Sequence, residues 1–257
     1  MRSYLILLSI APLFGQFDLR PPSFGCHVDS TRQLRRLDGV RASLVASPVV
    51  DSVTGGLCDG GLVLYQSGGE VVLSNGNERH ALALPEGAKL ALDEAMAVAA
   101  SPVSGELYYW NDDGWQLSPA RVESSLVALR VEGGRAMLLS ADHLSTIDIV
   151  SGAVERSEPI PAFSQVVSVL SDGSILTVIE ERWSHCSGGG CSDLGNAPAE
   201  IDSLVPLRDG WLVAATRSGT VHAVRVTDGR VESFLLPGSA QEGSGQEGRG
   251  HEGSAQE

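Results

Sequence analysis

The densest group of chemically capable side chains is the segment 180–186, which reads EERWSHC. Its carboxylates, imidazole and thiol are groups that acid–base catalysis or a metal site would use, with Glu181 and His185 as the candidates. A zinc site usually has four ligands, however, and only His185, Cys186 and Cys191 lie together here. Adjacent residues on a strand face opposite ways, so the two glutamates cannot converge on one atom. We interpret the segment as a strand end leading into a disulfide-linked hairpin.

A second candidate is the acidic segment 111–114, which reads NDDG. The carboxylates of Asp112 and Asp113 offer clustered oxygens of the kind that calcium prefers, but the distal glutamate of the twelve-residue calcium loop is missing. Asn, Asp and Gly are also the residues that tight hairpin turns require. We therefore predict a turn, and expect no metal ligand here.

Two other groups have both a chemical and a structural interpretation. Asp142 and His143 resemble part of a hydrolase triad, but the chain has no Gly-x-Ser-x-Gly motif, and we predict a turn. Four tryptophans are able to form a stacking platform for a sugar, although such residues more often pack between elements: Trp110, Trp115, Trp183 and Trp211. No catalytic, cofactor-binding or metal-binding residue is assigned, and no cofactor is expected.

The elements that carry these residues repeat. Turn glycines recur at intervals of 38, 38, 38 and 39 residues: Gly76, Gly114, Gly152, Gly190 and Gly229. Each of the later turns joins two β-like runs and follows a pair of continuous apolar runs, which is typical of strands buried on both faces. A unit of two inner and two outer strands repeated near 40 residues indicates a β-propeller blade.

The sequence therefore predicts an all-β fold, a β-propeller of about five four-stranded blades plus an N-terminal outer hairpin. The predicted blades are 41–86, 88–121, 123–162, 164–196 and 200–237. The hairpin at 24–38 has too few residues before it to complete a blade. Either five blades close with this hairpin packed beside the last one, or the ring has six positions and one is incomplete. The frame places four residues on equivalent, buried second strands: Ala97, Leu138, Ile175 and Val213.

One segment also fits a helix. Residues 88–100 (AKLALDEAMAVAA) have high helix propensity. The repeat frame instead places 89–92 and 96–99 on the two inner strands of a blade, and we predict strands.

The ends of the chain differ from its body. Residues 1–15 contain the apolar run YLILLSIAPLF, which is too short to span a membrane and predicts a signal peptide. Residues 16–237 are the predicted propeller domain. Residues 238–257 form four pentapeptides without an apolar residue larger than alanine, and they predict a disordered tail. The predicted location is secreted or periplasmic.

Export makes disulfides the expected state of the four cysteines. Cys186 and Cys191 enclose a flexible Ser-Gly-Gly-Gly loop, so their pairing is favoured. Cys26 and Cys58 then remain as the second pair by elimination.

Charge limits the partners. The net charge is −14, with 18 basic against 32 acidic residues, so no basic patch is available for nucleic acid or an anionic membrane surface. We expect a monomer that binds an unidentified protein or carbohydrate as a binding or scaffold module. The alternative is a propeller enzyme with an axial active site. Converging Asp, Glu, His or Arg side chains in the axial channel would support the enzyme, and mixed apolar ones the module.

The segment 219–232 (GTVHAVRVTDGRVE) resembles the blade repeat of the quinoprotein-like propellers (the PQQ-type blade), and 151–154 (SGAV) is a shorter copy. The resemblance implies a propeller fold and an extracytoplasmic location, but not an activity. The alternative enzyme would be quinoprotein-dehydrogenase-like, or a hydrolase or lyase. Ser233-Phe234 and Arg156-Ser157 stand where a tryptophan usually follows the turn in that family, and we expect no quinone cofactor.

Overall fold

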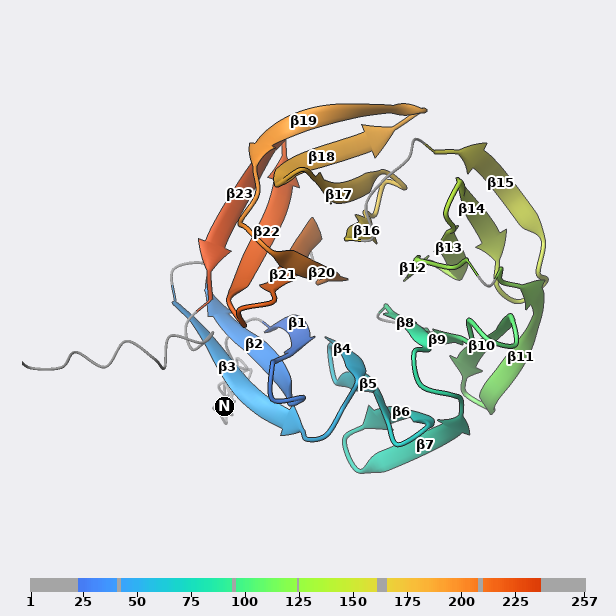
Figure 1. Ribbon diagram of the computed structural model, residues 1–257. Coiled ribbons are helices and arrows are strands. Elements are labelled where there is room, and N and C mark those ends of the chain that lie inside the picture. The colour runs from blue at the N-terminus through green and yellow to red at the C-terminus, as the bar shows by residue number, and fades with distance from the viewer. Residues whose placement is uncertain are drawn as a thin grey trace, which may run out of the picture.

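The computed structural model describes residues 23–40, 43–93, 96–123, 125–160, 166–207 and 210–236. These residues form six antiparallel sheets arranged as blades around a central axis (Figure 1). The predicted signal peptide at 1–15 and the predicted tail at 238–257 lie outside the described residues. No helix among the described residues is long and apolar enough to cross a membrane.

The first three blades are built from consecutive strands. Blade 1 contains β1 (Ser23–Val28), β2 (Leu34–Val40) and β3 (Ser43–Val50). Blade 2 contains β4 (Gly55–Asp59), β5 (Leu62–Ser67), β6 (Glu70–Asn75) and β7 (Glu78–Ala83). Blade 3 contains β8 (Lys89–Leu92), β9 (Ala97–Ala100), β10 (Glu106–Asn111) and β11 (Gly114–Arg121).

The last three blades follow the same order. Blade 4 contains β12 (Ala128–Glu132), β13 (Arg135–Leu139), β14 (His143–Asp148) and β15 (Val154–Pro159). Blade 5 contains β16 (Val167–Val169), β17 (Ile175–Ile179), β18 (Arg182–Ser187) and β19 (Gly190–Asn196). Blade 6 contains β20 (Ile201–Pro206), β21 (Trp211–Thr216), β22 (Val221–Thr227) and β23 (Arg230–Leu235).

The number of blades corrects the main sequence-based prediction: the ring has six blades rather than about five. The alternative that the sequence left open, six positions with one incomplete blade, agrees with the three described strands of blade 1. The error lies in the predicted blade 41–86, because β3 pairs along β2 and belongs to blade 1, and blade 2 begins at Gly55. Val45 and Val49 are 59% and 37% exposed, and Pro48 lacks an N–H, which fits an outer edge strand and not an inner one. In the other blades the fourth, outermost strand leads into the first, innermost strand of the next blade. Because β3 leads into β4 in this way, β3 is a fourth strand, and β1 and β2 are the second and third strands of blade 1.

The boundaries of the other blades agree with the predicted repeat. Blades 3 to 6 lie within the predicted ranges, and the four predicted second-strand residues are buried on β9, β13, β17 and β21. They are not fully equivalent, because Val213 packs towards the following blade and the other three pack towards the preceding one. The helical interpretation of 88–100 is wrong, because these residues form β8 and β9. Ala97 and Ala99 pack towards blade 2 whereas Val98 and Ala100 pack towards blade 4, so a strand buries both faces of this apolar run.

Four of the five turn glycines behave as predicted. Gly76, Gly114, Gly152 and Gly229 have φ of +61°, +116°, +72° and +71° in outer hairpins. The fifth hairpin turns at Gly188 and Gly189 instead, and Gly190 already lies on β19.

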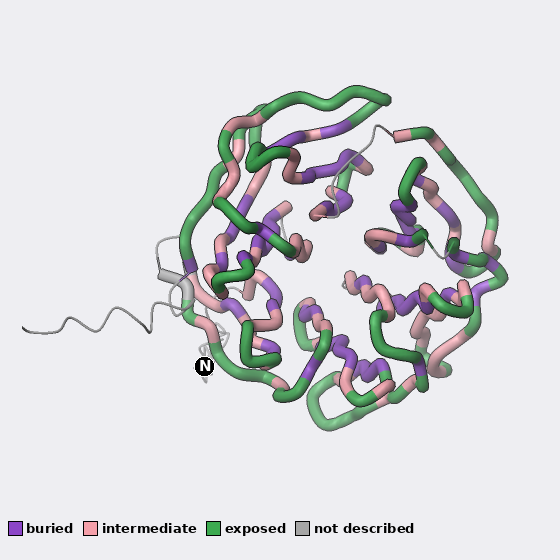
Figure 2. Tube along the Cα trace, in the orientation of Figure 1, coloured by how far each residue is buried: buried purple, intermediate pink, exposed green. Residues whose placement is uncertain are grey.

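The hydrophobic core consists of six clusters, one at each contact between neighbouring blades. Buried residues consequently lie inside the ring of blades, and the outer strands are mostly exposed (Figure 2). Leu37 of blade 1 packs with Trp211 and Val213 of blade 6, so apolar packing closes the ring in the described part of the chain. Each blade needs its neighbours to bury its faces, which makes the ring one cooperative unit.

Both predicted disulfides are present. Cys186 and Cys191 face each other on β18 and β19 with a Cα–Cα distance of 4.0 Å. Cys26 on β1 and Cys58 on β4 are 5.1 Å apart at Cα, so this bond links blade 1 to blade 2. Such bonds are typical of proteins from an oxidising, extracellular environment.

Candidate functional site

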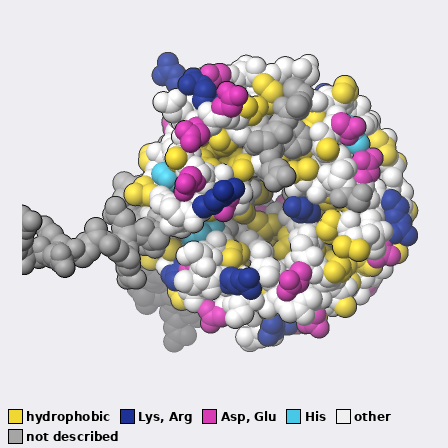
Figure 3. Space-filling model, viewed as in Figure 1, with side chains coloured by type: hydrophobic (Ala, Val, Ile, Leu, Met, Phe, Trp, Pro, Cys, Tyr) yellow, Lys and Arg dark blue, Asp and Glu magenta, His cyan; other side chains and the backbone are white. Residues whose placement is uncertain are grey.

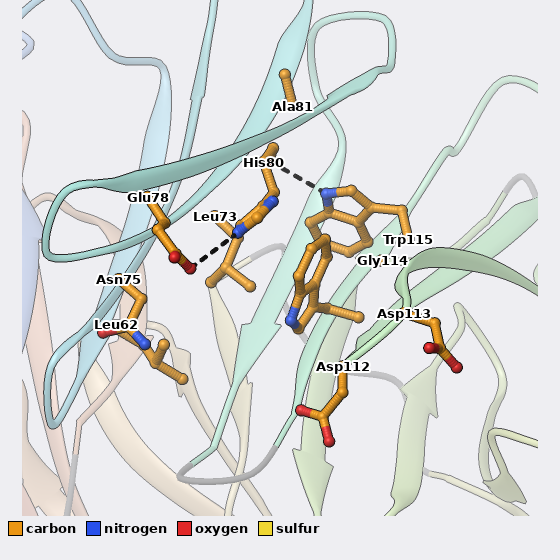
Figure 4. A pocket seen from close by; sticks show the side chains of 11 residues that line it. Leu62, Leu73, Asn75, Glu78, His80, Ala81, Asp112, Asp113, Gly114 and Trp115 are labelled. Atoms are coloured by element: carbon orange, nitrogen blue, oxygen red, sulfur yellow. Dashed lines mark hydrogen bonds and ion pairs between the residues drawn. The ribbon is translucent and has the colours of Figure 1, made fainter.

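A groove of about 610 Å³ lies where the outer parts of blades 2 and 3 meet. Strands β5, β6 and β7 line one side, and β10, β11 and their turn line the other (Figure 4). We call it the tryptophan groove, and its lining consists of Leu62, Leu73, Asn75, Glu78, His80, Ala81, Trp110, Asp112, Asp113, Gly114 and Trp115.

Two indole rings form one wall of this groove. Trp110 and Trp115 pair directly across β10 and β11, so both rings project from the same face of the blade. Their centroids are 5.8 Å apart and their planes meet at 76°. The His80 ring of blade 2 lies 4.2 Å from the Trp110 ring, and the His80 carbonyl accepts a 3.2 Å hydrogen bond from Trp115 Nε1–H. These contacts hold both rings in place although neither is fully buried.

Carboxylates surround the aromatic wall. Glu78 Oε2 lies 3.8 Å from His80 Nε2, and the exposed Asp112 and Asp113 form the turn between β10 and β11 (Figure 4). The side chain of Asn111 shapes this turn, because its Oδ1 accepts the backbone N–H of Asp113 at 3.0 Å. None of the eleven lining residues is Lys or Arg. The groove is therefore both aromatic and acidic.

Neighbouring positive charge is directed away from the groove. Arg79 stands between Glu78 and His80 on β7, and its side chain therefore leaves the opposite face of the strand. Its guanidinium donates a hydrogen bond to the Tyr65 hydroxyl and lies over the Tyr65 ring. On the face seen in Figure 3, acidic, basic and hydrophobic side chains are interspersed, and the Lys and Arg side chains of the described residues lie singly or in small groups.

The axis of the propeller holds a second cavity, of about 410 Å³. Its lining includes the apolar residues Leu57, Ala91 and Leu129 as well as four charged residues, Asp59, Asp93, Arg130 and Glu132. Arg130 Nε lies 3.5 Å from Glu132 Oε2. The Asp93 carboxylate accepts backbone N–H groups from Met96 at 2.7 Å and Gly133 at 3.1 Å, and so holds the turn after β8. Asp93, Arg130 and Glu132 thus have partners within the fold.

The segment 180–186 does not assemble a reactive site. Glu181 lies in the β17–β18 turn with φ of +59°, whereas His185 lies on β18. His185 Nε2 is 2.7 Å from the Ser174 hydroxyl, which donates to Asp172 at 2.5 Å. The serine stands between imidazole and carboxylate, so the histidine is not oriented by the acid as in a catalytic triad. Burial raises the pKa of Asp172, but the hydrogen bonds from Ser174 outweigh it and hold that pKa below its ordinary value.

Asp142 and His143 lie at the start of β14, with His143 Nδ1 2.7 Å from Asp142 Oδ1. The structure adds Glu123, whose Oε1 is 3.6 Å from His143 Nε2 and which no sequence motif identifies. Both carboxylates are exposed and His143 is half-buried, so the group lies at the surface.

The tryptophans thus divide into two kinds. Trp183 and Trp211 are 1% and 4% exposed and pack between blades, as the sequence-based interpretation expects. Trp110 and Trp115 also contact the core, but they line the tryptophan groove together with Asp112 and Asp113. Glu78 and His80, which complete the groove, were not candidates from the sequence.

Known proteins resemble this chain in fold. No model of a protein family matches the sequence, and no curated protein matches it. Among solved structures, a chain of the nidogen/laminin complex aligns with 84% of this chain and 94% of its own length, at 10% identity and a TM-score of 0.54. The WD40 β-propeller domain of Doa1 aligns over 85% of this chain and 81% of its own, at 13% identity and the same TM-score.

A form of Hsv2 from Kluyveromyces lactis is more distant, with a TM-score of 0.48 and 11% identity over 68% of this chain and 59% of its own. At these identities the likeness shows the β-propeller fold alone.

Proposed function

We propose that this chain is an exported binding or scaffold module, and that it contacts a protein partner through the tryptophan groove. The observation that carries the proposal is the wall of two ordered, partly exposed indole rings inside an open groove of about 610 Å³. Aromatic residues and concave surfaces are enriched where proteins bind partners, since rigid rings contribute large contact area at low entropic cost.

Two further facts support the proposal. The nidogen/laminin structure is a complex of two proteins, so a similar propeller takes part in a protein assembly there. Two disulfides fit export, in agreement with the apolar N-terminal segment and with the extracytoplasmic habit of the quinoprotein-like propellers that 219–232 resembles. Secreted or periplasmic placement and a monomeric state are parts of the proposal.

The alternative, an enzyme with an axial active site, has less support. Its requirement is a set of acidic, basic or imidazole side chains that converge in the axial channel. The cavity is lined by Asp59, Asp93, Arg130 and Glu132, but Asp93 holds a turn and Arg130 pairs with Glu132. We therefore assign neither a reaction nor a quinone cofactor.

Site-specific photocrosslinking tests the proposal. A benzophenone side chain replaces Asn75, an exposed groove residue that pairs with Glu78 on the groove face, or as a control Val154, which is 64% exposed on the outer strand of blade 4. Both proteins are exposed to the proteins secreted by the source organism, irradiated and digested. We expect defined crosslinks at position 75 and none at position 154. Equal labelling at the two positions, or no crosslink at position 75, would overturn the assignment of the groove.

A further inference from the structure

The tryptophan groove combines an aromatic corner with negative charge. The Trp110 and Trp115 planes meet at 76°, and the His80 ring lies against Trp110 with a tilt of 35°. A cation placed over an indole face is attracted by the ring quadrupole, and tryptophan is the strongest of the aromatic partners. An arrangement of rings at an angle lets one cation contact more than one π-face.

Among the polar side chains of the groove, Asn75 and His80 also offer N–H donors, but carboxylates are the larger part. Glu78, Asp112 and Asp113 are carboxylates, which only accept hydrogen bonds when ionised. A sugar hydroxyl needs both donors and acceptors around it, whereas a guanidinium has five donors and no acceptor. The hydrogen-bonding character of the lining therefore matches a donor-only ligand better than a carbohydrate.

The groove contains no cation of its own. The nearest guanidinium along β7, that of Arg79, is engaged with Tyr65 on the other face of the strand. No Lys or Arg is among the residues that line the groove. The whole chain has a net charge of −14, so its field also attracts basic partners.

From these observations we propose that the tryptophan groove binds an arginine side chain of the protein partner, with the guanidinium against Trp110 and Trp115 and hydrogen-bonded to the Asp112 and Asp113 carboxylates. The proposal deepens the proposed function and rests on it. Planar guanidinium groups stack on aromatic faces and bind carboxylates through two parallel N–H groups, which a lysine ammonium does not do.

The internal control is the set of four tryptophans. In the oxidised full-length chain, the assigned indole N–H signals of Trp110 and Trp115 report on the groove by NMR, while those of Trp183 and Trp211 report on buried contacts elsewhere. The probe is N-acetylarginine methylamide, titrated to about 50 mM, well above a Kd near 1 mM for a weak single-side-chain contact. The corresponding citrulline compound and diacetylchitobiose are titrated in parallel.

We expect the arginine compound alone to shift the Trp110 and Trp115 signals. Replacing both acids (Asp112→Asn with Asp113→Asn) should weaken binding about fivefold, because each exposed ion pair contributes little, and added salt should weaken it further. A control with the same charge change, Asp202→Asn with Asp228→Asn, alters exposed residues of blade 6 and should leave the affinity unchanged.

Equal shifts with citrulline, shifts with the disaccharide instead, unchanged affinity in the double acid variant, or no shift with any probe would each overturn the arginine proposal. Crosslinks at position 75 that persist in such a case would leave the proposed protein-binding function intact. Their absence would remove the proposed function as well, so the two failures are distinguishable.

Discussion

The two disulfides differ in what they join, and this predicts different effects on stability. Cys26–Cys58 links blade 1 to blade 2 across 32 positions of sequence, whereas Cys186–Cys191 closes a hairpin across 5. In the chain-entropy model, closing these loops stabilises the fold by about 3.7 and about 2.2 kcal/mol. Cys26 and Cys58 are both buried while Cys191 is exposed, so alanine substitution also removes more buried sulfur from the first pair.

We therefore expect Cys26→Ala/Cys58→Ala to cost at least about 1.5 kcal/mol more than Cys186→Ala/Cys191→Ala. Urea denaturation of the oxidised proteins, followed by circular dichroism and by tryptophan fluorescence, measures both free energies of unfolding. Coincidence of the two signals checks that unfolding is a single transition. An equal or greater loss in the hairpin variant would refute the view that the long-range bond secures the ring.

The same bond has a local consequence. Blade 1 contacts blade 6 through the apolar cluster around Leu37 and Trp211. Apart from the chain itself, the Cys26–Cys58 disulfide is its one covalent link to a neighbouring blade among the described residues. Local opening is easiest where few contacts resist it. Hydrogen exchange in the Cys26→Ala/Cys58→Ala variant should accelerate in β1 to β3 more than in β12 to β15. A uniform acceleration would mean that the ring opens only as a whole.

Two further predictions concern a turn glycine and a partly buried acid. Gly152→Ala should lower the free energy of unfolding by about 2–3 kcal/mol and Gly76→Ala by about 1 kcal/mol. Both glycines have positive φ, but only the methyl group at 152 would meet a neighbouring backbone atom, Ala120 N, at 2.8 Å. Equal urea midpoints for the two variants would contradict this. Burial raises the pKa of Asp29, yet hydrogen bonds from Thr31 and Arg35 outweigh it and lower that pKa from 3.8 to about 2. The ionised form is thus favoured by folding, so Asp29→Asn should be less stable than wild type at neutral pH. The difference in free energy of unfolding between wild type and Asp29→Asn should vanish as the pH falls from 3.8 to about 2. If urea denaturation at about pH 2 still showed the difference, ionisation of Asp29 would not be its cause.

The repeat could be predicted from sequence because its signals are local. A turn glycine with positive φ and an apolar run buried on both faces are properties of single blades. The hairpin at 24–38 is predicted from sequence, but its third strand is assigned to the next blade, because strand position depends on packing between distant segments. Pro48 is the local signal that the sequence offers, because a proline points to an edge strand. The exposure of Val45 and Val49 is visible only in the structure.

The groove could be predicted only in part for the same reason. Asp112, Asp113 and the two tryptophans are close in sequence. The sequence suggests a different chemistry for each pair: calcium ligation for the acids and sugar stacking for the indole rings. Glu78 and His80 precede Trp110 by about one repeat, and only the stacking of blade 2 on blade 3 brings them together. The frame itself implies this contact, because equivalent outer turns of successive blades must be neighbours in a propeller.

Strand direction places the groove and the axial cavity on one face of the ring. Alternate strands of an antiparallel blade run the same way, so β4 and β6 end on the same face, at Asp59 and Asn75. Asp59 is at the axial cavity and Asn75 lines the groove. A stable protein interface buries about 800 Å² on each partner, which is more than one arginine-sized contact provides. A partner held at the tryptophan groove would therefore extend over this same face towards the axis, where the apolar wall of the axial cavity offers the next concave surface.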